Sequence, residues 1–299
     1  KLKGQKFKIG VEDVNFNIEE GEIFSIIGLN GAGKTTIMKC LLGLLDYDSG
    51  DINILGEKKL TEKIKTQIGY LPEISYYPKS ISLEVLMEYY AELYGIKNKE
   101  EKIVNALEKV GLISRRKSKL EDFSKGMLQK VGIAQAILNS PKLLFLDEPM
   151  SGLDPLARFE VIKLIKELKE KGTTIILNTH ILNDIETIGN RGIVVNKGKV
   201  VNSFDLNDLR KEATYTVHYK NGIEKNISKS ALDSKLKELE EISDIVKEKF
   251  SLEEYFDRNA ETYYNTIQST HELNREIFLR DLSQWISYYT EALAIELSR

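Results

Sequence analysis

One glycine-rich segment, residues 28–35 with the sequence GLNGAGKT, carries the residue types that bind a triphosphate. It matches the pattern G-x-x-x-x-G-K-[ST], in which glycines let backbone N–H groups approach phosphate oxygens closely. Lys34 would supply a positive charge for the β- and γ-phosphates, and the Thr35 hydroxyl would bind Mg²⁺. The predicted phosphate-binding residues are Gly28, Asn30, Gly31, Ala32, Gly33, Lys34, Thr35 and Thr36.

A second segment, residues 143–148 with the sequence LLFLDE, places two carboxylates directly after an apolar run. If the run forms a buried strand, Asp147 and Glu148 lie at its C-terminal end, the edge where open α/β sheets bind ligands. Asp147 would hold the shell of the Mg²⁺, and Glu148 would polarise the attacking water as a general base. A strand that ends in acids is common, so this prediction depends on the phosphate-binding motif in the same chain.

Three further segments make the chain resemble the ABC ATPase family over roughly residues 10–205. Residues 123–127, FSKGM, resemble the family signature usually written LSGGQ, and residues 151–154, SGLD, resemble the D-loop. His180, at the end of an apolar run, resembles the switch histidine. The resemblance implies ATP and Mg²⁺ as cofactors. It also implies an α/β P-loop NTPase core with a mainly parallel sheet, an antiparallel β-subdomain and an inserted helical subdomain.

The resemblance further implies that two ATPase subunits, identical or related, meet head to tail with ATP between them. Ser124 and the Gly126 backbone would contact the γ-phosphate of the partner's nucleotide, and Asp154 would cross the interface near the partner's P-loop. His180 would contact the γ-phosphate and help orient the water that Glu148 activates. ATP would join the dimer and hydrolysis would release it, which gives a two-state switch.

The chain departs from the family pattern at three positions. Lys125 and Met127 replace a glycine and a glutamine of the signature, whereas Ser124 and Gly126 remain. Glu73, after the run IGYLP, stands where the family has the glutamine of the Q-loop. A carboxylate can still reach Mg²⁺ or its water, so Glu73 is predicted as a metal ligand together with Thr35 and Asp147.

Several of these residues have simpler explanations that stay open. Ser124 could be an ordinary helix cap, His180 a strand-end histidine, and Asp154 a turn residue between Gly152 and a proline. The aromatic residue that stacks on adenine in the family is either Phe7 or a residue upstream of the first one in this sequence.

Apolar runs alternate with helical patterns, which is typical of an α/β domain with a buried parallel sheet. The expected strands are residues 23–27, 142–146 and 174–178, and the expected helices are residues 35–45, 82–93, 100–110 and 156–171. Val14, Phe16 and Ile18 also alternate as in a strand. We predict an ABC ATPase domain over residues 1–205, with its helical subdomain at about residues 75–135. The resemblance implies that this subdomain contacts the permease. The candidate contact residues are Tyr76, Tyr77, Leu86 and Tyr90, although several of them could instead be core residues.

The remaining chain is predicted to form a small α+β accessory domain over residues 206–257 and a helical extension over residues 258–299. A hairpin is expected at residues 214–227 around Asn221-Gly222, followed by a helix at about residues 229–241 and a short strand at about residues 245–250. The extension repeats apolar residues at steps of three and four. That face either packs on the protein's own core or contacts a partner.

Composition narrows the protein class. The formal net charge of −3 gives no global basic surplus, so no nucleic-acid partner is expected. The single cysteine allows no disulfide within the chain, which favours the cytoplasm. No apolar run approaches the ~20 residues that cross a bilayer. With the resemblance, we expect a cytoplasmic subunit that is peripheral on the inner face of the cell membrane through separate permease subunits.

The Ser-Lys-Gly-Met signature, Glu73 and the run SLEEYF at residues 251–256 resemble the ATPases of ABC-2-type exporters. The resemblance implies an ATP-hydrolysing subunit that couples ATP-driven dimerisation to a permease. This chain does not identify the transported substrate, because selectivity lies in the membrane subunits.

Two alternatives stay open, a non-transport ABC ATPase and a regulatory module that binds ATP without hydrolysing it. DNA-repair relatives carry very long insertions before the signature, whereas here about 90 residues separate Thr35 from Ser124. Lys34, Asp147, Glu148 and His180 are all present, which favours hydrolysis over binding alone.

Overall fold

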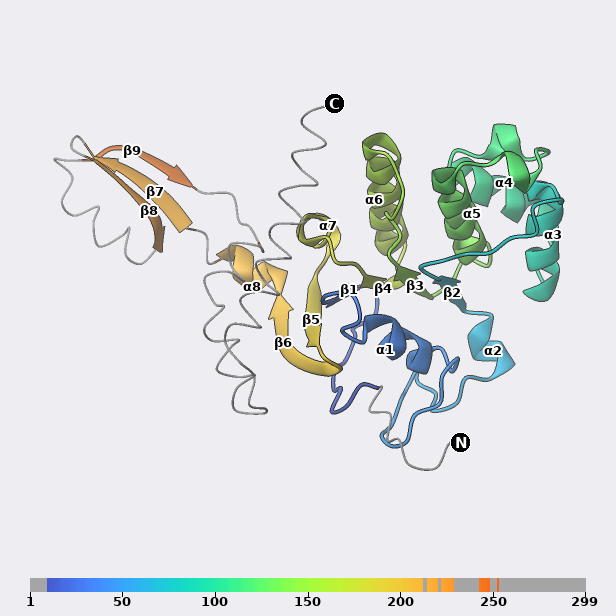
Figure 1. Cartoon of the computed structure of the whole chain (residues 1–299), viewed down its shortest axis with the longest axis horizontal. Helices are drawn as coiled ribbons and strands as arrows, with labels where there is room; N and C mark the ends of the chain where they lie inside the picture. The colour runs from blue at the N-terminus through green and yellow to red at the C-terminus, as the bar shows by residue number, and fades with distance from the viewer. Residues whose placement is uncertain (1–9, 212–213, 220–221, 229–241, 248–251, 253–299) are drawn as a thin grey trace. The chain divides into compact units, whose positions relative to one another are not determined.

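The structure is a computed structural model of the chain, and it describes residues 10–211, 214–219, 222–228, 242–247 and 252 (Figure 1). The chain folds into two compact units. The first comprises Lys1–Val200 and Phe204–Leu206, and the second Val201–Ser203 and Asn207–Arg299. Each unit is described by itself.

The first unit is built on a six-stranded sheet with the order β2-β3-β4-β1-β5-β6. The pairs β2–β3, β3–β4, β4–β1 and β1–β5 are all parallel. Every residue of β1, β3 and β4 is buried, as expected for strands covered on both faces. The strands are β1 Ile23–Ile27, β2 Ile68–Leu71, β3 Leu143–Asp147, β4 Thr174–Asn178, β5 Arg191–Asn196 and β6 Lys199–Asp205.

Helices cover both faces of this sheet (Figure 1). Successive side chains of a strand point to opposite faces, so the continuous apolar runs of the buried strands must be covered on both sides. Phe145 and Ile176 share one core with Met38 of α1, whereas Leu144 and Ile175 share the other with α5 and α6. The helices of this unit are α1 Lys34–Leu41, α2 Glu62–Lys65, α3 Leu83–Leu93, α4 Lys99–Lys109, α5 Lys125–Ile137, α6 Pro155–Glu170 and α7 Leu182–Ile188. Helix α8, Leu206–Lys211, belongs to the second unit from Asn207 onward. Two short 3₁₀ turns lie before α5, η1 Ile113–Arg115 and η2 Leu120–Asp122.

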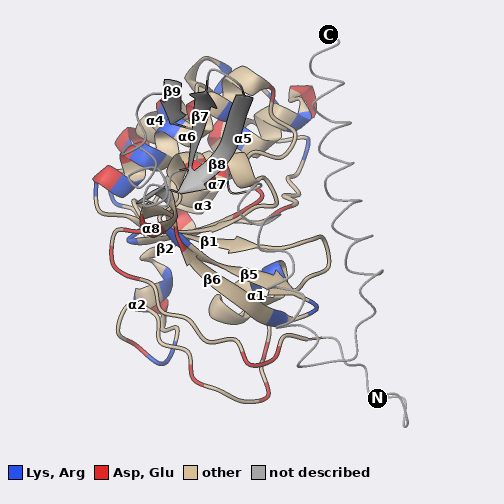
Figure 2. Ribbon diagram, turned by 90° about the vertical axis from the view of Figure 1, so that its left-hand side faces the viewer, with Lys and Arg blue, Asp and Glu red and all other residues tan. Residues whose placement is uncertain are grey.

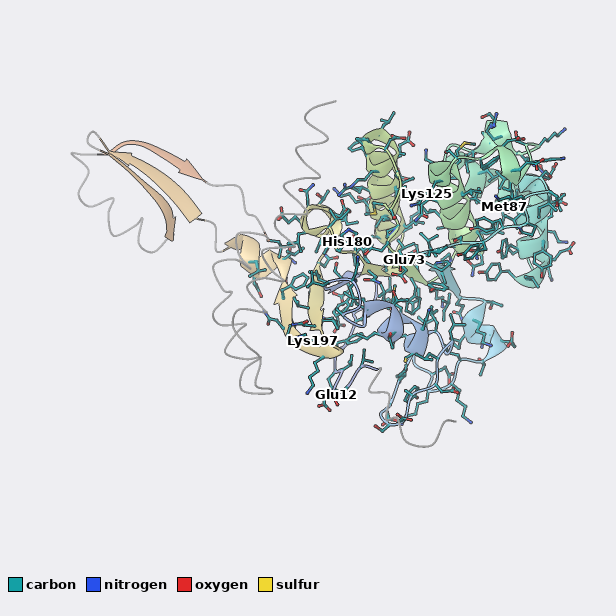
Figure 3. All side chains as sticks on the ribbon, in the orientation of Figure 1. Glu12, Glu73, Met87, Lys125, His180 and Lys197 are labelled. Atoms are coloured by element: carbon teal, nitrogen blue, oxygen red, sulfur yellow. The ribbon has the colours of Figure 1, made fainter. Side chains whose placement is uncertain are left out.

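Helices α3, α4 and α5 lie between β2 and β3 in the chain and form the expected helical layer. The Ser82 hydroxyl caps α3 by accepting from the Val85 N–H at 3.4 Å. Met87, which is labelled in Figure 3, lies on α3 and is fully buried. The layer shares its core with β2 and β3, so it holds the start of α5 next to the end of the sheet.

The predicted strands at residues 23–27, 142–146 and 174–178 agree with β1, β3 and β4 to within one residue. The helix expected over residues 35–45 ends earlier, at Leu41, because Gly43 turns into a left-handed conformation with φ 64°. The strand suggested by Val14, Phe16 and Ile18 is absent from the described residues. Those side chains do pack on the core below the sheet, with Phe16 stacked on Phe24 at 5.2 Å between ring centroids. Their alternation therefore reflects one-sided packing.

The predicted antiparallel part of the first unit is small among the described residues. It consists of the hairpin of β5 and β6, closed by Lys197 and Gly198 with φ 48° and 80°, and of two isolated bridges, Ile54 with Glu57 and Ser82 with Lys119. Positive φ at both turn residues matches the right-handed twist of the two strands.

The second unit contains a three-stranded antiparallel sheet with the order β8-β7-β9. Its strands are β7 Thr214–Tyr219, β8 Gly222–Ser228 and β9 Ile242–Lys247. Strands β7 and β8 agree with the predicted hairpin, whereas β9 lies three residues before the strand predicted at about residues 245–250. The helix expected at residues 229–241, the SLEEYF run and the extension at residues 258–299 lie outside the described residues, apart from Leu252. Phe7 lies outside them too.

Acidic and basic residues are interspersed on the face of the molecule drawn in Figure 2. Within the described ranges, none of the helices combines the length and the apolar character that a bilayer crossing demands.

Phe145 provides a test of the sheet's contribution to stability. It is fully buried in β3, whereas Phe159 on α6 is 65% exposed. Phe145→Ala leaves a cavity under the sheet and should lower the free energy of unfolding by about 3–5 kcal/mol. The matched variant Phe159→Ala should change it by less than about 0.5 kcal/mol. Urea unfolding followed by circular dichroism measures both, and equal losses would contradict this account of the core.

Candidate functional site

The phosphate-binding motif forms the turn between β1 and α1. Gly33, with φ 112°, occupies the N-cap of α1, and no side chain caps this helix end. The first N–H groups of α1 are therefore left for an anion, which the helix dipole also favours. A Cβ on Gly28 would lie 2.3 Å from the carbonyl oxygen of Val195, so the turn packs too closely on β5 for any larger residue.

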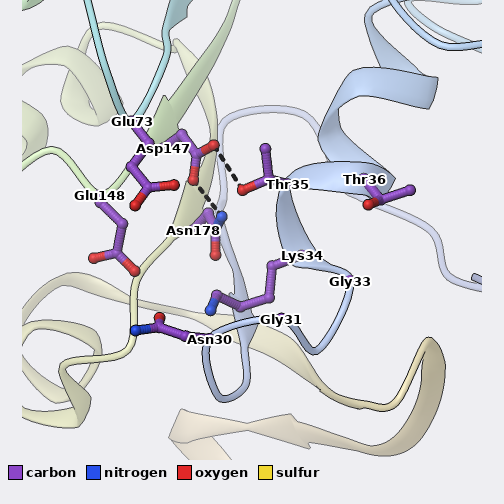
Figure 4. Close-up of a pocket in the computed structure, with 10 residues that line it drawn as sticks. All are labelled: Asn30, Gly31, Gly33, Lys34, Thr35, Thr36, Glu73, Asp147, Glu148 and Asn178. Carbon is purple, nitrogen blue, oxygen red and sulfur yellow. Dashed lines mark hydrogen bonds between the residues drawn. The ribbon is translucent and has the colours of Figure 1, made fainter. Parts of the chain in front are cut away.

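A polar pocket opens beside this turn, and Figure 4 shows its residues. They come from the turn, from the start of α1 and from the C-terminal ends of β2, β3 and β4. The lining residues are Asn30, Gly31, Gly33, Lys34, Thr35, Thr36, Glu73, Asp147, Glu148 and Asn178. Most residues predicted for phosphate and metal binding thus meet in one place, whereas Gly28 and Ala32 shape the turn behind it.

Lys34 points into the pocket although only 6% of it is exposed. Its Nζ donates to the carbonyl oxygens of Gly28 at 2.7 Å and Leu29 at 3.2 Å. Burial lowers the pKa of Lys34, and the carboxylates of Glu148, Asp147 and Glu73 oppose that shift. A buried cation held mainly by carbonyls suits an incoming anion such as a phosphate.

Asp147 is the most enclosed acid of the pocket, with no exposed surface. Its carboxylate accepts hydrogen bonds from the Thr35 hydroxyl at 3.0 Å and from the Asn178 amide. Burial raises the pKa of Asp147; the bonds from Thr35 and Asn178 lower it, and the nearby carboxylates of Glu73 and Glu148 raise it further. A buried acid in this environment gains from a positive charge placed beside it.

The donor set around Asp147 fits Mg²⁺. Thr35 and Asp147 offer hard oxygen ligands in contact with each other, and Glu73 adds a further carboxylate at the pocket wall. The described residues contain no cluster of three or more His, Cys, Asp or Glu side chains able to hold a metal by themselves. In phosphate sites Mg²⁺ binds through one or two protein ligands, water and the phosphates of the substrate, so the Thr35–Asp147 pair is a sufficient protein contribution.

Glu148, which lines the pocket, is paired with His180, which follows β4. The His180 Nδ1 lies 2.8 Å from the Glu148 Oε1, and the Glu148 side chain is 10% exposed. The Glu148 backbone is left-handed, with φ 50°, a conformation that costs on the order of 1–3 kcal/mol for a residue other than glycine. The Glu148 N–H donates to the Asn178 carbonyl at 2.8 Å. Such strain, held by its surroundings, is typical of functional sites.

Besides Gly28, Ala32 and His180, three predicted site residues do not line the pocket, namely Ser124, Gly126 and Asp154. Ser124 caps α5 by accepting from the Met127 N–H at 3.2 Å, and Asp154 caps α6 by accepting from the Ala157 N–H at 2.9 Å. Ser124 therefore fills the capping role that the sequence left open, whereas Asp154 is a helix cap and not the turn residue that the sequence offered as its simpler role. A Cβ on Gly126 would lie 3.2 Å from the Gly152 carbonyl, so the signature and the D-loop are adjacent. A role at a partner's nucleotide remains compatible with capping, which uses only one acceptor position.

Two functional candidates escaped the sequence analysis. Asn178, the last residue of β4, lies opposite Asp147 in the parallel register and contacts its carboxylate. Asn178 follows an apolar run, as Asp147 does, and this pattern could have identified it from the sequence. Gln129 lies within α5 and donates to the Glu148 carbonyl at 3.1 Å. Nothing in its sequence context marks that contact, which joins residues 19 positions apart.

Known proteins are similar to this chain in sequence. The family described as ABC transporter matches residues 11–151. An ABC transporter ATP-binding protein of Synechocystis is 38% identical over 73% of this chain and 63% of its own length. One from Methanocaldococcus jannaschii is 34% identical over 82% of this chain and 92% of its own length. The bacitracin transport ATP-binding protein of Bacillus licheniformis is 38% identical, with 67% and 66% covered. The chain thus spans less than two thirds of the Synechocystis relative.

Solved structures agree with the fold. The ATP-binding subunit of an ABC transporter superposes with a TM-score of 0.64 and 36% identity, covering 69% of this chain and 88% of its own. A dimeric ATP-binding cassette in a post-hydrolysis state, bound to ADP and Pi, gives 0.60 and 26%, covering 66% and 90%. The mainly parallel α/β architecture is therefore that of ABC ATPase domains.

The buried charge of Asp147 predicts a pH-dependent cost to stability in the absence of divalent cations. Because the pKa of Asp147 in the folded protein lies above the ordinary value of 3.8, stability is lost as pH rises from that value through the folded pKa. Asp147→Asn retains the size but not the charge, and both contacts can persist if the new amide oxygen accepts from Asn178 and its NH2 group donates to the Thr35 hydroxyl. In EDTA at pH 7 it should raise the Tm by a few degrees, and the gain should shrink toward pH 4.

Differential scanning calorimetry from pH 4 to pH 8 measures this difference. Asp122→Asn, at an exposed position of η2, is the matched control and should leave the Tm unchanged. A lower Tm for Asp147→Asn at pH 7 in EDTA would show that the ionised carboxylate stabilises the fold.

Proposed function

The chain belongs to the ATP-binding proteins of ABC transporters, and we propose that it hydrolyses MgATP to drive a separate membrane permease. One observation carries the proposal. The phosphate-binding turn, the Thr35–Asp147 pair and the Glu148–His180 pair come from distant parts of the chain and meet at one edge of the sheet. Fold resemblance alone would not support a reaction, but this arrangement of groups does.

Binding would begin at the turn and at Lys34. The free N–H groups at the start of α1 and the Lys34 ammonium would receive the β- and γ-phosphates. The Lys34 Nζ would exchange its two carbonyl acceptors for phosphate oxygens, which are stronger partners for a buried cation. Thr35, Asp147 and Glu73 would hold Mg²⁺, which supplies charge neutralisation at the phosphates when bound.

Hydrolysis would then depend on Glu148 and His180. The Glu148 carboxylate would accept a proton from a water whose oxygen attacks the γ-phosphorus, while the bond to the β-phosphate oxygen breaks and ADP leaves. His180 would hold the Glu148 carboxylate through its Nδ1 and direct its other ring nitrogen toward the γ-phosphate. The 10% exposure of the Glu148 side chain limits the number of waters that can compete.

A second subunit would complete the site. Ser124 and Gly126 lie at the N-terminus of α5, beside the D-loop that contains Asp154, and all three lie outside the chain's own pocket. A partner chain arranged head to tail would place them against its nucleotide. The dimeric relative that holds ADP and Pi supports such an arrangement.

The permease contact would lie on the helical layer. Of the four residues proposed from the sequence, Leu86 is only 3% exposed and belongs to the core, and Tyr77 and Tyr90 pack against that core. Tyr76 is 88% exposed. The structure adds Val85, Tyr89 and Leu93, which are 50%, 57% and 63% exposed at steps of four along α3. An exposed apolar stripe of this kind is typical of a partner surface.

An export role is the finer part of the proposal. It is supported by relatives named for bacitracin transport and for linearmycin resistance, which are 38% and 37% identical to this chain. The location that follows is cytoplasmic and peripheral at the inner face of the membrane. The competing function is a regulatory module that binds ATP without hydrolysis, and the Glu148–His180 contact favours hydrolysis over it.

Glu148→Gln separates these two functions. It removes the proton acceptor but preserves the size of the side chain, so Mg-dependent phosphate release should fall at least about 100-fold. Because ATP would then persist, size-exclusion chromatography with MgATP should show a stable dimer. Glu170→Gln, at the exposed end of α6, is the control and should behave as the wild type. A wild-type protein, with its membrane partner, that releases no phosphate would exclude the enzyme.

The double variant Tyr76→Ser/Tyr89→Ser tests the permease surface. Removing two exposed aromatic rings should reduce recovery of the membrane subunit in co-purification from membranes by about 10-fold, while the phosphate release of the isolated chain persists. Leu44→Ser/Tyr47→Ser, at residues 62% and 49% exposed after α1, is the control. Equal recovery with both double variants would place the contact elsewhere.

A further inference from the structure

The conformation of Glu148 needs support from outside its own segment. Its φ of 50° is left-handed, and Pro149 follows it directly. A residue before proline prefers an extended backbone, so this segment does not adopt the observed turn by local preference. Because the direction of the side chain follows from the backbone, whatever holds this turn also aims the carboxylate.

Gln129 of α5 holds the turn from one side. Its Nε2 donates to the carbonyl oxygens of both Glu148 and Pro149, each at 3.1 Å. On the other side, the Glu148 N–H donates to the Asn178 carbonyl at the end of β4. Gln129 is 9% exposed, so water competes little for these bonds. The peptide after Glu148 is thus clamped between a helix and the sheet.

The clamp also connects two parts of the mechanism. Gln129 lies five positions after Ser124 on the same helix, which corresponds to about 7.5 Å along its axis. Ser124 is the residue assigned to the partner's nucleotide, and Glu148 is the general base of the chain's own site. A continuous helix of 13 residues therefore joins the contact with one nucleotide to the base that acts on the other.

We propose that Gln129 is a positioning residue that fixes the Glu148 carboxylate for catalysis and transmits to it the engagement of Ser124 with the partner's nucleotide. This inference rests on the proposed function, since it concerns the same general base. The Gln129 amide donates to the backbone of Glu148 and Pro149, and Gln129 does not line the pocket proposed for the phosphates and Mg²⁺. Its contribution appears in the orientation of Glu148, and therefore in kcat rather than in ATP binding.

Gln129→Met tests the positioning. Methionine fills the same space without donors, so kcat should fall about 10- to 100-fold, as expected when a reacting group is misplaced by a fraction of an ångström or more. The KM for ATP, and the affinity for a fluorescent ATP analogue in EDTA, should stay within about twofold of the wild type, because the phosphate-binding turn is untouched.

Gln135→Met is the matched control. Gln135 lies on the same helix, six positions further along, and its Nε2 donates at 3.3 Å to the Tyr94 hydroxyl instead of to the Glu148 segment. It should keep wild-type kcat even where its Tm falls as much as that of Gln129→Met. Equal kcat values for the two variants, or a loss of ATP affinity that accounts for the loss of rate, would overturn the positioning role.

A double-mutant cycle tests the transmission. If Gln129 relays the contact made by Ser124, the variant Ser124→Ala/Gln129→Met should lose no more kcat than the more impaired single variant. Losses that multiply would show two independent roles and overturn the relay. A wild-type protein without Mg-dependent phosphate release would instead refute the proposed function, and the two failures are thereby distinguished.

Discussion

The parallel register of β3 with β4 and of β4 with β1 is the constraint on which the site depends. It places Asp147 opposite Asn178 and brings the turn after β1 to the same edge of the sheet. All three strands are buried on both faces, so their register is fixed by two cores at once. A slip of one residue would turn every side chain to the other face. The positions of Lys34, Thr35 and Asp147 are therefore consequences of how the sheet packs.

Burial at this edge brings charges into surroundings that disfavour them. Lys34 and Asp147 are both nearly inaccessible, and burial is the largest cause of the shift in each pKa. Neither group is satisfied by the other, because Lys34 donates to carbonyls and Asp147 accepts from Thr35 and Asn178. A triphosphate with its cation offers each of them an opposite charge. The same desolvation that weakens the fold thus favours the ligand.

The sequence predicted what depends on contiguous residues. The turn GLNGAGKT contains its own glycines, cation and hydroxyl, and apolar runs marked the strands β1, β3 and β4. Contacts between distant segments could not be inferred in the same way. Gln129 resembles any polar residue of a helix until α5 is packed beside the end of β3. The alternation of Val14, Phe16 and Ile18 was a correct signal of one buried face, but hydrogen bonding to a neighbouring strand is a tertiary property that it did not contain. Ser124 and Asp154 show the opposite case, in which one side chain satisfies both a local cap and a proposed distant role.

The strain at Glu148 connects these levels. A left-handed residue before proline is unfavourable in the free chain, so the turn exists only where α5 and β4 both hold it. Ser124 caps the start of α5, and β4 ends at Asn178, two residues before His180. The proposed general base is therefore oriented by elements whose ends are proposed to contact the nucleotide, and its geometry need not be the same before and after that contact forms. A carboxylate on a relaxed, self-supporting loop would lack this dependence, because nothing outside the loop would determine its direction.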